Sequence, residues 1–262
     1  MTAFKDIGVE KRGHVALVEI RRPPNNFFDA ALIGEIAAVF ESLDADADCR
    51  ALVLAAQGKA FCAGANFGDS DSDGRELLSG PRPGAAHLYL EGNRLFRTKK
   101  PIVAAVHGAA VGGGLGLAMV ADFRVTCPEA RFSANFTRLG FHPGFGLTVT
   151  LPAVIGPTKA ALMFYTSRRV RGDEAHAFGL ADVLVPQDQV RQASLSLAAE
   201  IAENSPLGLI ATRATLRGDL ADRVRAATEH ELAEQSRLRK TEDFKEGVKA
   251  MAERRLPVFN NR

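Results

Sequence analysis

Residues 100–118 constrain the fold more than any other stretch of this chain. An apolar, strand-like run at residues 101–106 leads toward the glycines Gly112, Gly113 and Gly114, and an apolar, helix-like run follows. Glycines placed between a strand and a helix allow a very close approach of the backbone, because no Cβ stands in the way. A buried strand that turns directly into a helix is typical of α/β proteins with largely parallel sheets.

Hydrophobic periodicity along the rest of the chain supports an α/β fold. Strands are expected at residues 14–20, 50–56, 101–106 and 122–127, with helices at 30–43, at 85–97 and from the glycines onward. Loops are expected at residues 57–65 and, as a mobile segment, at 69–84. After residue 152 we expect helices at 153–165 and 172–177, a short strand at 181–185, and three or four helices from residue 189.

The chain divides into a core of residues 1–204 and a C-terminal helical region of residues 205–262, with the boundary at Ser205-Pro206. Fewer than ~70 residues rarely form a good core alone, so the helical region is expected to pack on the main body or on another subunit.

Composition excludes several classes of protein. With 262 residues, 46% hydrophobic content and a net charge of +2, the chain forms a substantial core and gives no reason to expect nucleic acid or a membrane as partner. Its three cysteines show no metal-ligand spacing and predict reduced thiols in a cytoplasmic protein. The N-terminus has no apolar run typical of a signal peptide. No metal site is expected. Residues 69–74 match the start of a calcium-binding loop, but the twelfth position, where such a loop needs Glu, is Gly80.

The glycines also predict chemistry. The backbone N–H groups at a helix start have no intrahelical acceptor, and they suit an oxygen that becomes negative, such as a thioester carbonyl turning into an enolate. The structural alternative is a tight strand–helix turn. The glycines do not match the dinucleotide-binding G-x-G-x-x-G pattern, and Gly58-Lys59 is followed by Ala60 rather than by the residues of a phosphate-binding loop.

Several blocks, in the same order, resemble the crotonase (enoyl-CoA hydratase/isomerase) superfamily over nearly the full length. They are RPPNNF at residues 22–27, GKAFCAGAN at 58–66, KPIVAAVHGAAVGGG at 100–114, LGFHPG at 139–144 and ERRLPVF at 253–259. This resemblance implies an α/β spiral of ββα repeats with a C-terminal helical trimerisation region, and a homotrimer or a dimer of trimers. It also implies an acyl-CoA substrate, with coenzyme A as part of the substrate and no separate cofactor.

The resemblance assigns roles to particular positions. The amides of Ala65 and Gly113 correspond to the oxyanion hole that binds the thioester oxygen. The remaining substrate-binding positions, which lie along the pantetheine arm or around the acyl group, are Asn26, Ala63, Gly64, Asn66, Gly112, Gly116, Phe136 and Gly144.

The chain departs from the family at the acidic positions. The two hydratase glutamates correspond to Gly116 and Phe136, and a third acidic position used by some members corresponds to Gly144. Hydration needs one group to activate water and another to protonate carbon, so classical hydration is not expected. Isomerisation, thioester hydrolysis, decarboxylation and carbon–carbon cleavage remain open. Strand alternation would turn Phe136 toward the acyl group and Asn135 and Thr137 away from it.

His142 is the candidate acid or base, because it stands beside the third empty position and titrates near neutral pH. The alternative is a turn histidine bonded to the backbone. A second class of function, a non-catalytic acyl-CoA binding protein, would keep the donors and the apolar pocket without acid–base groups. A titratable side chain at the thioester would distinguish the enzyme from the binding protein. A third possibility, a purely structural oligomer without a ligand, is disfavoured because it does not explain the backbone donors at the glycine-rich segment.

Overall fold

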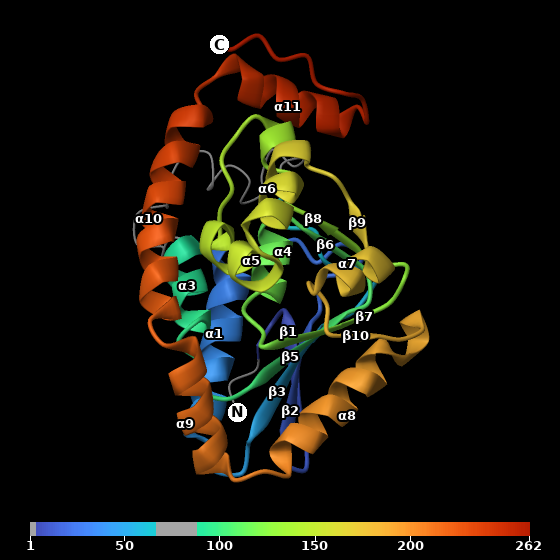
Figure 1. Cartoon of the computed structure of the whole chain (residues 1–262), viewed down its shortest axis with the longest axis vertical. Helices are drawn as coiled ribbons and strands as arrows, with labels where there is room; N and C mark the ends of the chain where they lie inside the picture. The colour runs from blue at the N-terminus through green and yellow to red at the C-terminus, as the bar shows by residue number, and fades with distance from the viewer. Residues whose placement is uncertain (1–3, 67–87) are drawn as a thin grey trace.

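The computed structural model describes residues 4–66 and 88–262 (Figure 1). The mobile segment expected at residues 69–84 lies outside the described residues. The larger of two sheets has the order β1-β2-β3-β5-β7-β10, and all its pairs are parallel except β1 with β2. Its strands are β1 (Ile7–Arg12), β2 (Val15–Ile20), β3 (Ala51–Ala56), β5 (Ile102–Val106), β7 (Phe123–Thr126) and β10 (Val183–Leu184).

A smaller sheet has the order β4-β6-β8-β9, in which β9 runs antiparallel to β8. Its strands are β4 (Ala60–Cys62), β6 (Ala109–Val111), β8 (Arg131–Ser133) and β9 (Val170–Arg171). The expected loop at residues 57–65 therefore contains a strand. Such three-residue strands are too short to give a periodic signal in the sequence.

A repeating unit builds the core: a strand of the larger sheet, then a strand of the smaller sheet, then a helix. The units β5-β6-α4 and β7-β8-α5 follow one another along the chain, so the fold is a spiral of ββα repeats. The helices of this part are α1 (Ala30–Ala45), α3 (Leu88–Leu95), α4 (Gly113–Ala118), α5 (Leu147–Ile155), α6 (Pro157–Thr166) and α7 (Gly172–Phe178), with short 3-10 turns η1 (Thr137–Leu139) and η2 (Gln187–Gln189).

Four helices form the C-terminal part: α8 (Val190–Ala202), α9 (Pro206–Arg217), α10 (Leu220–Leu238) and α11 (Glu242–Ala252). Ser205 caps α9 by accepting from the Gly208 amide, and Pro206 follows it, as the sequence predicts. The long α10 runs beside α3 and α5, and α8 packs on β3 and β5 (Figure 1). One expected helix, at residues 153–165, is two helices broken at Gly156, whose φ is 78°.

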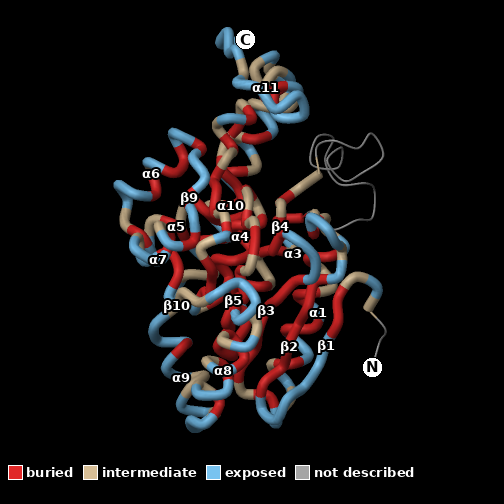
Figure 2. Tube along the Cα trace, turned by 90° about the vertical axis from the view of Figure 1, so that its right-hand side faces the viewer, coloured by how far each residue is buried: buried red, intermediate tan, exposed pale blue. Residues whose placement is uncertain are grey.

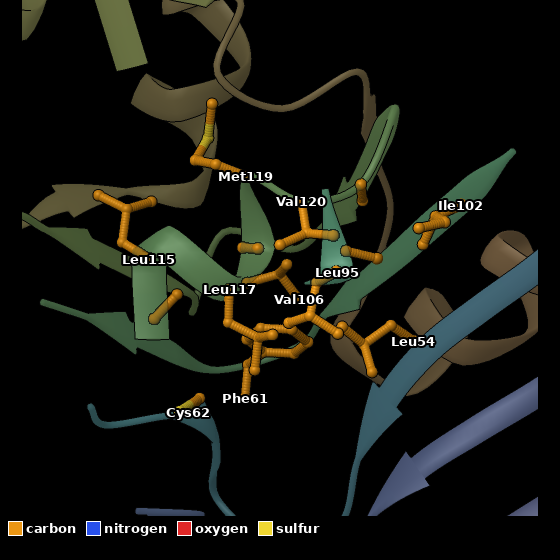
Figure 3. Packing of buried hydrophobic residues seen from close by; sticks show 14 of the residues in the cluster. Leu54, Phe61, Cys62, Leu95, Ile102, Val106, Leu115, Leu117, Met119 and Val120 are labelled. Carbon is orange, nitrogen blue, oxygen red and sulfur yellow. The ribbon is translucent and has the colours of Figure 1, made fainter. Parts of the chain in front are cut away.

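The hydrophobic core lies between the sheets and their helices. Strands β2, β3 and β5 are buried along their whole length, as expected for parallel strands covered on both faces (Figure 2). Side chains from several elements, among them Leu54, Phe61, Val106 and Leu117, are directed into one apolar cluster (Figure 3). This packing holds β4, β6 and α4 in place, and the ends of these three elements form the candidate site. None of the described helices is both long and apolar enough to cross a membrane.

Candidate active site

Two loops approach each other at the glycines. A Cβ atom built on Gly64 would lie 2.7 Å from the Val111 carbonyl oxygen and 3.5 Å from the Gly113 nitrogen. A Cβ atom on Gly114 would lie 2.0 Å from the Cys62 carbonyl oxygen. Real Cβ atoms do not come this close, so only glycine allows the loop after β4 to lie against the start of α4.

The amides of Ala65 and Gly113 lie on these two loops. Within residues 4–66 and 88–262, neither amide donates a hydrogen bond. Gly113 is the first residue of α4, where amides have no intrahelical acceptor. Neighbouring backbone groups are paired: Phe28 N donates to Gly64 O (3.0 Å) and Gly112 N donates to Ser133 O (2.8 Å). The two loops are thus fixed, while two backbone donors have no acceptor in the part of the chain that the structure describes.

A cavity of about 50 Å³ lies at the junction of the two loops. Many of the positions assigned from the resemblance line it: Ala63, Gly64, Ala65, Gly112, Gly113, Phe136 and Gly144. The other lining residues are Phe28, Leu88, Tyr89, Val111, Asn135, Leu139, Phe141, Phe145, Gln235 and Arg239. The wall is mostly apolar, which suits an acyl group and strengthens any hydrogen bond made inside.

Asn26 is not among the residues that line this cavity, and its side chain has a structural role. It is fully buried, donates to Gln57 O (2.6 Å) and Ala60 O (2.8 Å), and accepts from Arg22 N (3.0 Å). Asn26 therefore ties the turn before α1 to the loop before β4. Asn66 is half-buried and also lies outside the set of lining residues.

Gly116 faces an aromatic ring rather than open space. A Cβ atom built there would lie 2.8 Å from Phe145 Cβ and 2.9 Å from Phe145 Cδ1. Phe145 also stacks on Phe28, with ring centroids 5.4 Å apart, and it adopts φ of 61°, a strained conformation for a bulky residue. The space beside the first family glutamate position is filled by this phenyl group.

The second glutamate position, Phe136, is also part of an aromatic cluster. Phe136 is 6% exposed, and its ring lies 5.6 Å from that of Phe141, which in turn contacts Phe244. The expected strand alternation is wrong here, because β8 ends at Ser133 and a 3-10 turn begins at Thr137. Asn135 and Phe136 consequently both line the cavity, while the Thr137 hydroxyl donates to Phe164 O (2.6 Å).

At the third position, polar side chains occupy the space beside Gly144. A Cβ atom on Gly144 would lie 2.0 Å from the Tyr89 hydroxyl and 2.5 Å from Gln235 Nε2. The Tyr89 hydroxyl donates to Gln235 Oε1 (2.7 Å), and Arg239 Nη2 donates to the same oxygen (3.0 Å). Burial raises the pKa of Tyr89 well above its usual value, so the phenol stays protonated at neutral pH.

His142 is placed away from the cavity lining. Its Nδ1 is hydrogen-bonded to the Pro143 carbonyl (2.8 Å), and its ring packs edge-on against His230, with centroids 5.8 Å apart. The main chain of His142 does support the site, because its carbonyl accepts from Gln235 Nε2 (2.9 Å). This arrangement matches the alternative interpretation, a turn histidine bonded to backbone.

No carboxylate or imidazole group among the described residues lines the cavity. Glu231, on the same helix as Gln235, accepts instead from the amides of Gly146 (2.8 Å) and Thr148 (3.2 Å) at the start of α5. Burial raises the pKa of Glu231. Among the described residues, no cluster of His, Cys, Asp or Glu is able to hold a metal ion.

Sequence reasoning missed Tyr89, Gln235 and Arg239. Tyr89 and Gln235 are separated by 146 residues, and they meet only because α10 lies along α3. Arg239, immediately after α10, is half-buried, and its burial lowers its pKa. A Gln and an Arg on an otherwise charged helix give no signal that they face a cavity.

Comparisons with known proteins agree on the family. The family model described as enoyl-CoA hydratase/isomerase matches residues 10–262. A mevalonyl-coenzyme A hydratase of Beauveria bassiana is 34% identical, over 95% of this chain and 92% of its own length. A short-chain-enoyl-CoA hydratase of Clostridium acetobutylicum is 30% identical, with 99% of each chain covered. A solved structure of an enoyl-CoA hydratase/isomerase from Pseudoalteromonas atlantica superimposes with a TM-score of 0.88 at 26% identity, covering 98% of this chain and 100% of that one.

Proposed function

Because this chain belongs to the enoyl-CoA hydratase/isomerase family, we propose that it processes an acyl-CoA thioester whose carbonyl oxygen is bound by the amides of Ala65 and Gly113. One observation carries the proposal: Ala65 and Gly113 line the same apolar cavity, and no acceptor among the described residues uses their amides. Two N–H donors held in a fixed, apolar site stabilise the negative charge that develops on a thioester oxygen.

The same cavity argues against hydration. Addition of water to an enoyl thioester needs an acid–base pair, and each such group contributes ~10²–10⁴ in rate. The positions at which hydratases carry that pair are Gly116 and Phe136, and an aromatic ring lies against each of them. We propose instead a reaction that produces the enolate without a base, namely cleavage of a carbon–carbon bond, as in decarboxylation. In decarboxylation, the carboxylate on the α-carbon leaves as CO₂, and the electrons of the broken carbon–carbon bond move to the α-carbon and the thioester oxygen. A proton from solvent then adds to the α-carbon.

A non-catalytic acyl-CoA binding protein remains the second candidate, and the absence of an acid–base pair among the described lining residues favours it. One experiment separates the two functions. The protein is incubated with a panel of acyl-CoA thioesters, including saturated, enoyl and carboxylated acyl groups, and the products are followed by mass spectrometry. A time-dependent loss of one thioester supports the enzyme. Binding of thioesters without any product supports the binding protein.

We also propose that the protein assembles as a trimer or a dimer of trimers. Helix α9 supports this, because Leu207 and Leu216 are 79% and 82% exposed and Arg213 is its one buried residue. Light scattering at micromolar concentration tests the assembly, and a monomeric mass contradicts it. A cytoplasmic location is supported by the three cysteines, which are all buried and unbridged.

A further inference from the structure

The feature that the proposed reaction leaves unexplained is the cation of Arg239 in the wall of an apolar cavity. Its Nε is buried and has no hydrogen-bond partner, and no carboxylate among the described residues forms an ion pair with it. One guanidinium nitrogen, Nη2, donates to the neutral side-chain oxygen of Gln235. A half-buried cation that has no counter-ion among the described residues is costly, so a protein that keeps one in a binding cavity has a place ready for an anion.

Neighbouring groups fix this guanidinium rather than neutralise it. Gln235 Oε1 accepts from both Arg239 and Tyr89, and Gln235 Nε2 is anchored on the His142 carbonyl. A planar guanidinium held in this way presents its remaining donors in a fixed geometry, which matches the two oxygens of a carboxylate.

The position of the cation indicates which part of a ligand it meets. Arg239 lines the same cavity of about 50 Å³ as Ala65 and Gly113. About 10–15 Å³ of such cavity volume holds one water molecule, so a group that fills this cavity has only a few heavy atoms. The phosphates of coenzyme A are separated from the thioester by the whole pantetheine arm, so an anion at this distance from the oxyanion hole belongs to the acyl group.

We propose that the substrate is an acyl-CoA with a short acyl group that ends in a carboxylate, and that Arg239 binds this carboxylate, with Gln235 and Tyr89 as positioning residues. This inference rests on the proposed acyl-CoA function and adds the class of acyl group. Arg239 is here a specificity-determining residue, since it distinguishes carboxylated from neutral acyl groups.

The test compares thioesters that differ only in charge. Dissociation constants are measured by titration calorimetry for succinyl-CoA, for its terminal carboxamide analogue, for butyryl-CoA and for free coenzyme A. A charge-assisted hydrogen bond contributes ~10–100-fold in affinity, so succinyl-CoA is expected to bind that much more tightly than the carboxamide. Arg239→Gln is expected to abolish this difference between succinyl-CoA and its carboxamide.

Arg237→Gln serves as the matched control, because Arg237 is an exposed arginine at the end of the same helix, paired with Glu234 (2.7 Å). It is expected to keep the preference for the carboxylate. Arg239→Lys retains the charge without the planar fork and is expected to keep part of the preference. The comparison of carboxylate with carboxamide in the wild-type protein requires no variant, so a folding defect in Arg239→Gln does not remove the test.

Each failure has its own signature. Equal binding of succinyl-CoA and its carboxamide, both tighter than free coenzyme A, overturns the role of Arg239 and leaves the proposed function standing. An equal loss of affinity for free coenzyme A in Arg239→Gln assigns the guanidinium to a coenzyme phosphate and also overturns the proposal. Thioesters that bind no better than free coenzyme A contradict the proposed function itself, and the inference fails with it.

Discussion

The phenyl ring of Phe145 occupies the space into which a side chain at Gly116 would project, with only 2.8 Å between Phe145 Cβ and a Cβ atom at position 116. A glutamate at Gly116 therefore needs more than the substitution itself. The two positions are coupled through packing, although they are far apart in the sequence. This relationship sets the conditions under which a hydratase site can be rebuilt in this protein.

Gly116→Glu alone is expected to destabilise the protein by ~1–3 kcal/mol, because an overpacked core forces its neighbours to shift. The loss is expected to be smaller in a Phe145→Gly background, since glycine accepts the φ of 61° at that position and removes the ring. Urea denaturation of the two single variants and the double variant measures the coupling. Additive losses would show that Phe145 is not what excludes a side chain at Gly116.

Wild-type protein is expected to show no crotonyl-CoA hydratase turnover in the usual range of ~1–10³ s⁻¹. Restoring hydration is expected to require Gly116→Glu and Phe136→Glu together with Phe145→Gly, because one carboxylate lacks its partner and the ring leaves no room. Loss of crotonyl-CoA absorbance measures the rate. The variants with a single glutamate are the controls, and full hydration by the wild type would refute this interpretation of the site.

Removal of the Gly113 amide is expected to reduce turnover of the reactive thioester by ~10²–10³-fold. Gly113→Pro deletes the donor, but any Cβ at this position lies 2.2 Å from Phe28 Cζ. Phe28→Ala is therefore used as the background, and Gly113→Ala in that background is the control that keeps the N–H group. Equal activity of the proline and alanine variants would show that the Gly113 amide does not bind the thioester oxygen. If the protein has no turnover, thioester affinity is compared in the same pair.

His142→Ala is expected to leave turnover unchanged within about twofold, since the imidazole is bonded to the Pro143 carbonyl and lies outside the cavity lining. Tyr89→Phe is the contrasting variant, because its hydroxyl lines the cavity and donates to Gln235. It is expected to cost ~0.5–1.5 kcal/mol in stability, the usual worth of one hydrogen bond. Steady-state kinetics and urea denaturation measure the two effects. A His142→Ala protein with most of its activity lost would restore the histidine as acid or base.

Glu231 is expected to make stability depend on pH. Burial raises its pKa in the folded protein, so between its unfolded pKa of ~4.3 and the higher folded value the native state holds more protons than the unfolded state. The stabilising contribution of the protonated carboxyl is fully present below this window and declines as pH rises through the folded pKa. Urea denaturation from pH 4 to pH 8 is expected to show that decline in the wild type relative to Glu231→Gln. A difference between the two proteins that is independent of pH would contradict it.

Several features of this protein were predictable from the sequence because they are local demands of the backbone. Glycine is needed at positions 64 and 114, where two segments of the backbone lie in contact. Ser205 and Pro206 begin a helix, and continuous apolar runs become buried parallel strands. The ββα spiral followed from the resemblance. The short strands β4, β6 and β8 were not predictable, since three residues carry no measurable period.

The sequence by itself determined that glycines lie between a strand and a helix. Its resemblance to the family assigned the donor roles to Ala65 and Gly113 and identified three acidic positions as empty, because both depend only on residues at fixed places along the chain. Only the tertiary structure decided what fills the empty space. The ring of Phe145 lies against Gly116, and Tyr89 and Gln235 meet beside Gly144 across 146 residues of chain. The tertiary structure also bonds the His142 ring to the Pro143 carbonyl, outside the cavity lining, and places Arg239 in the cavity wall. Such contacts depend on how α10 packs along α3 and α5, and helix packing is set by whole surfaces rather than by any local pattern.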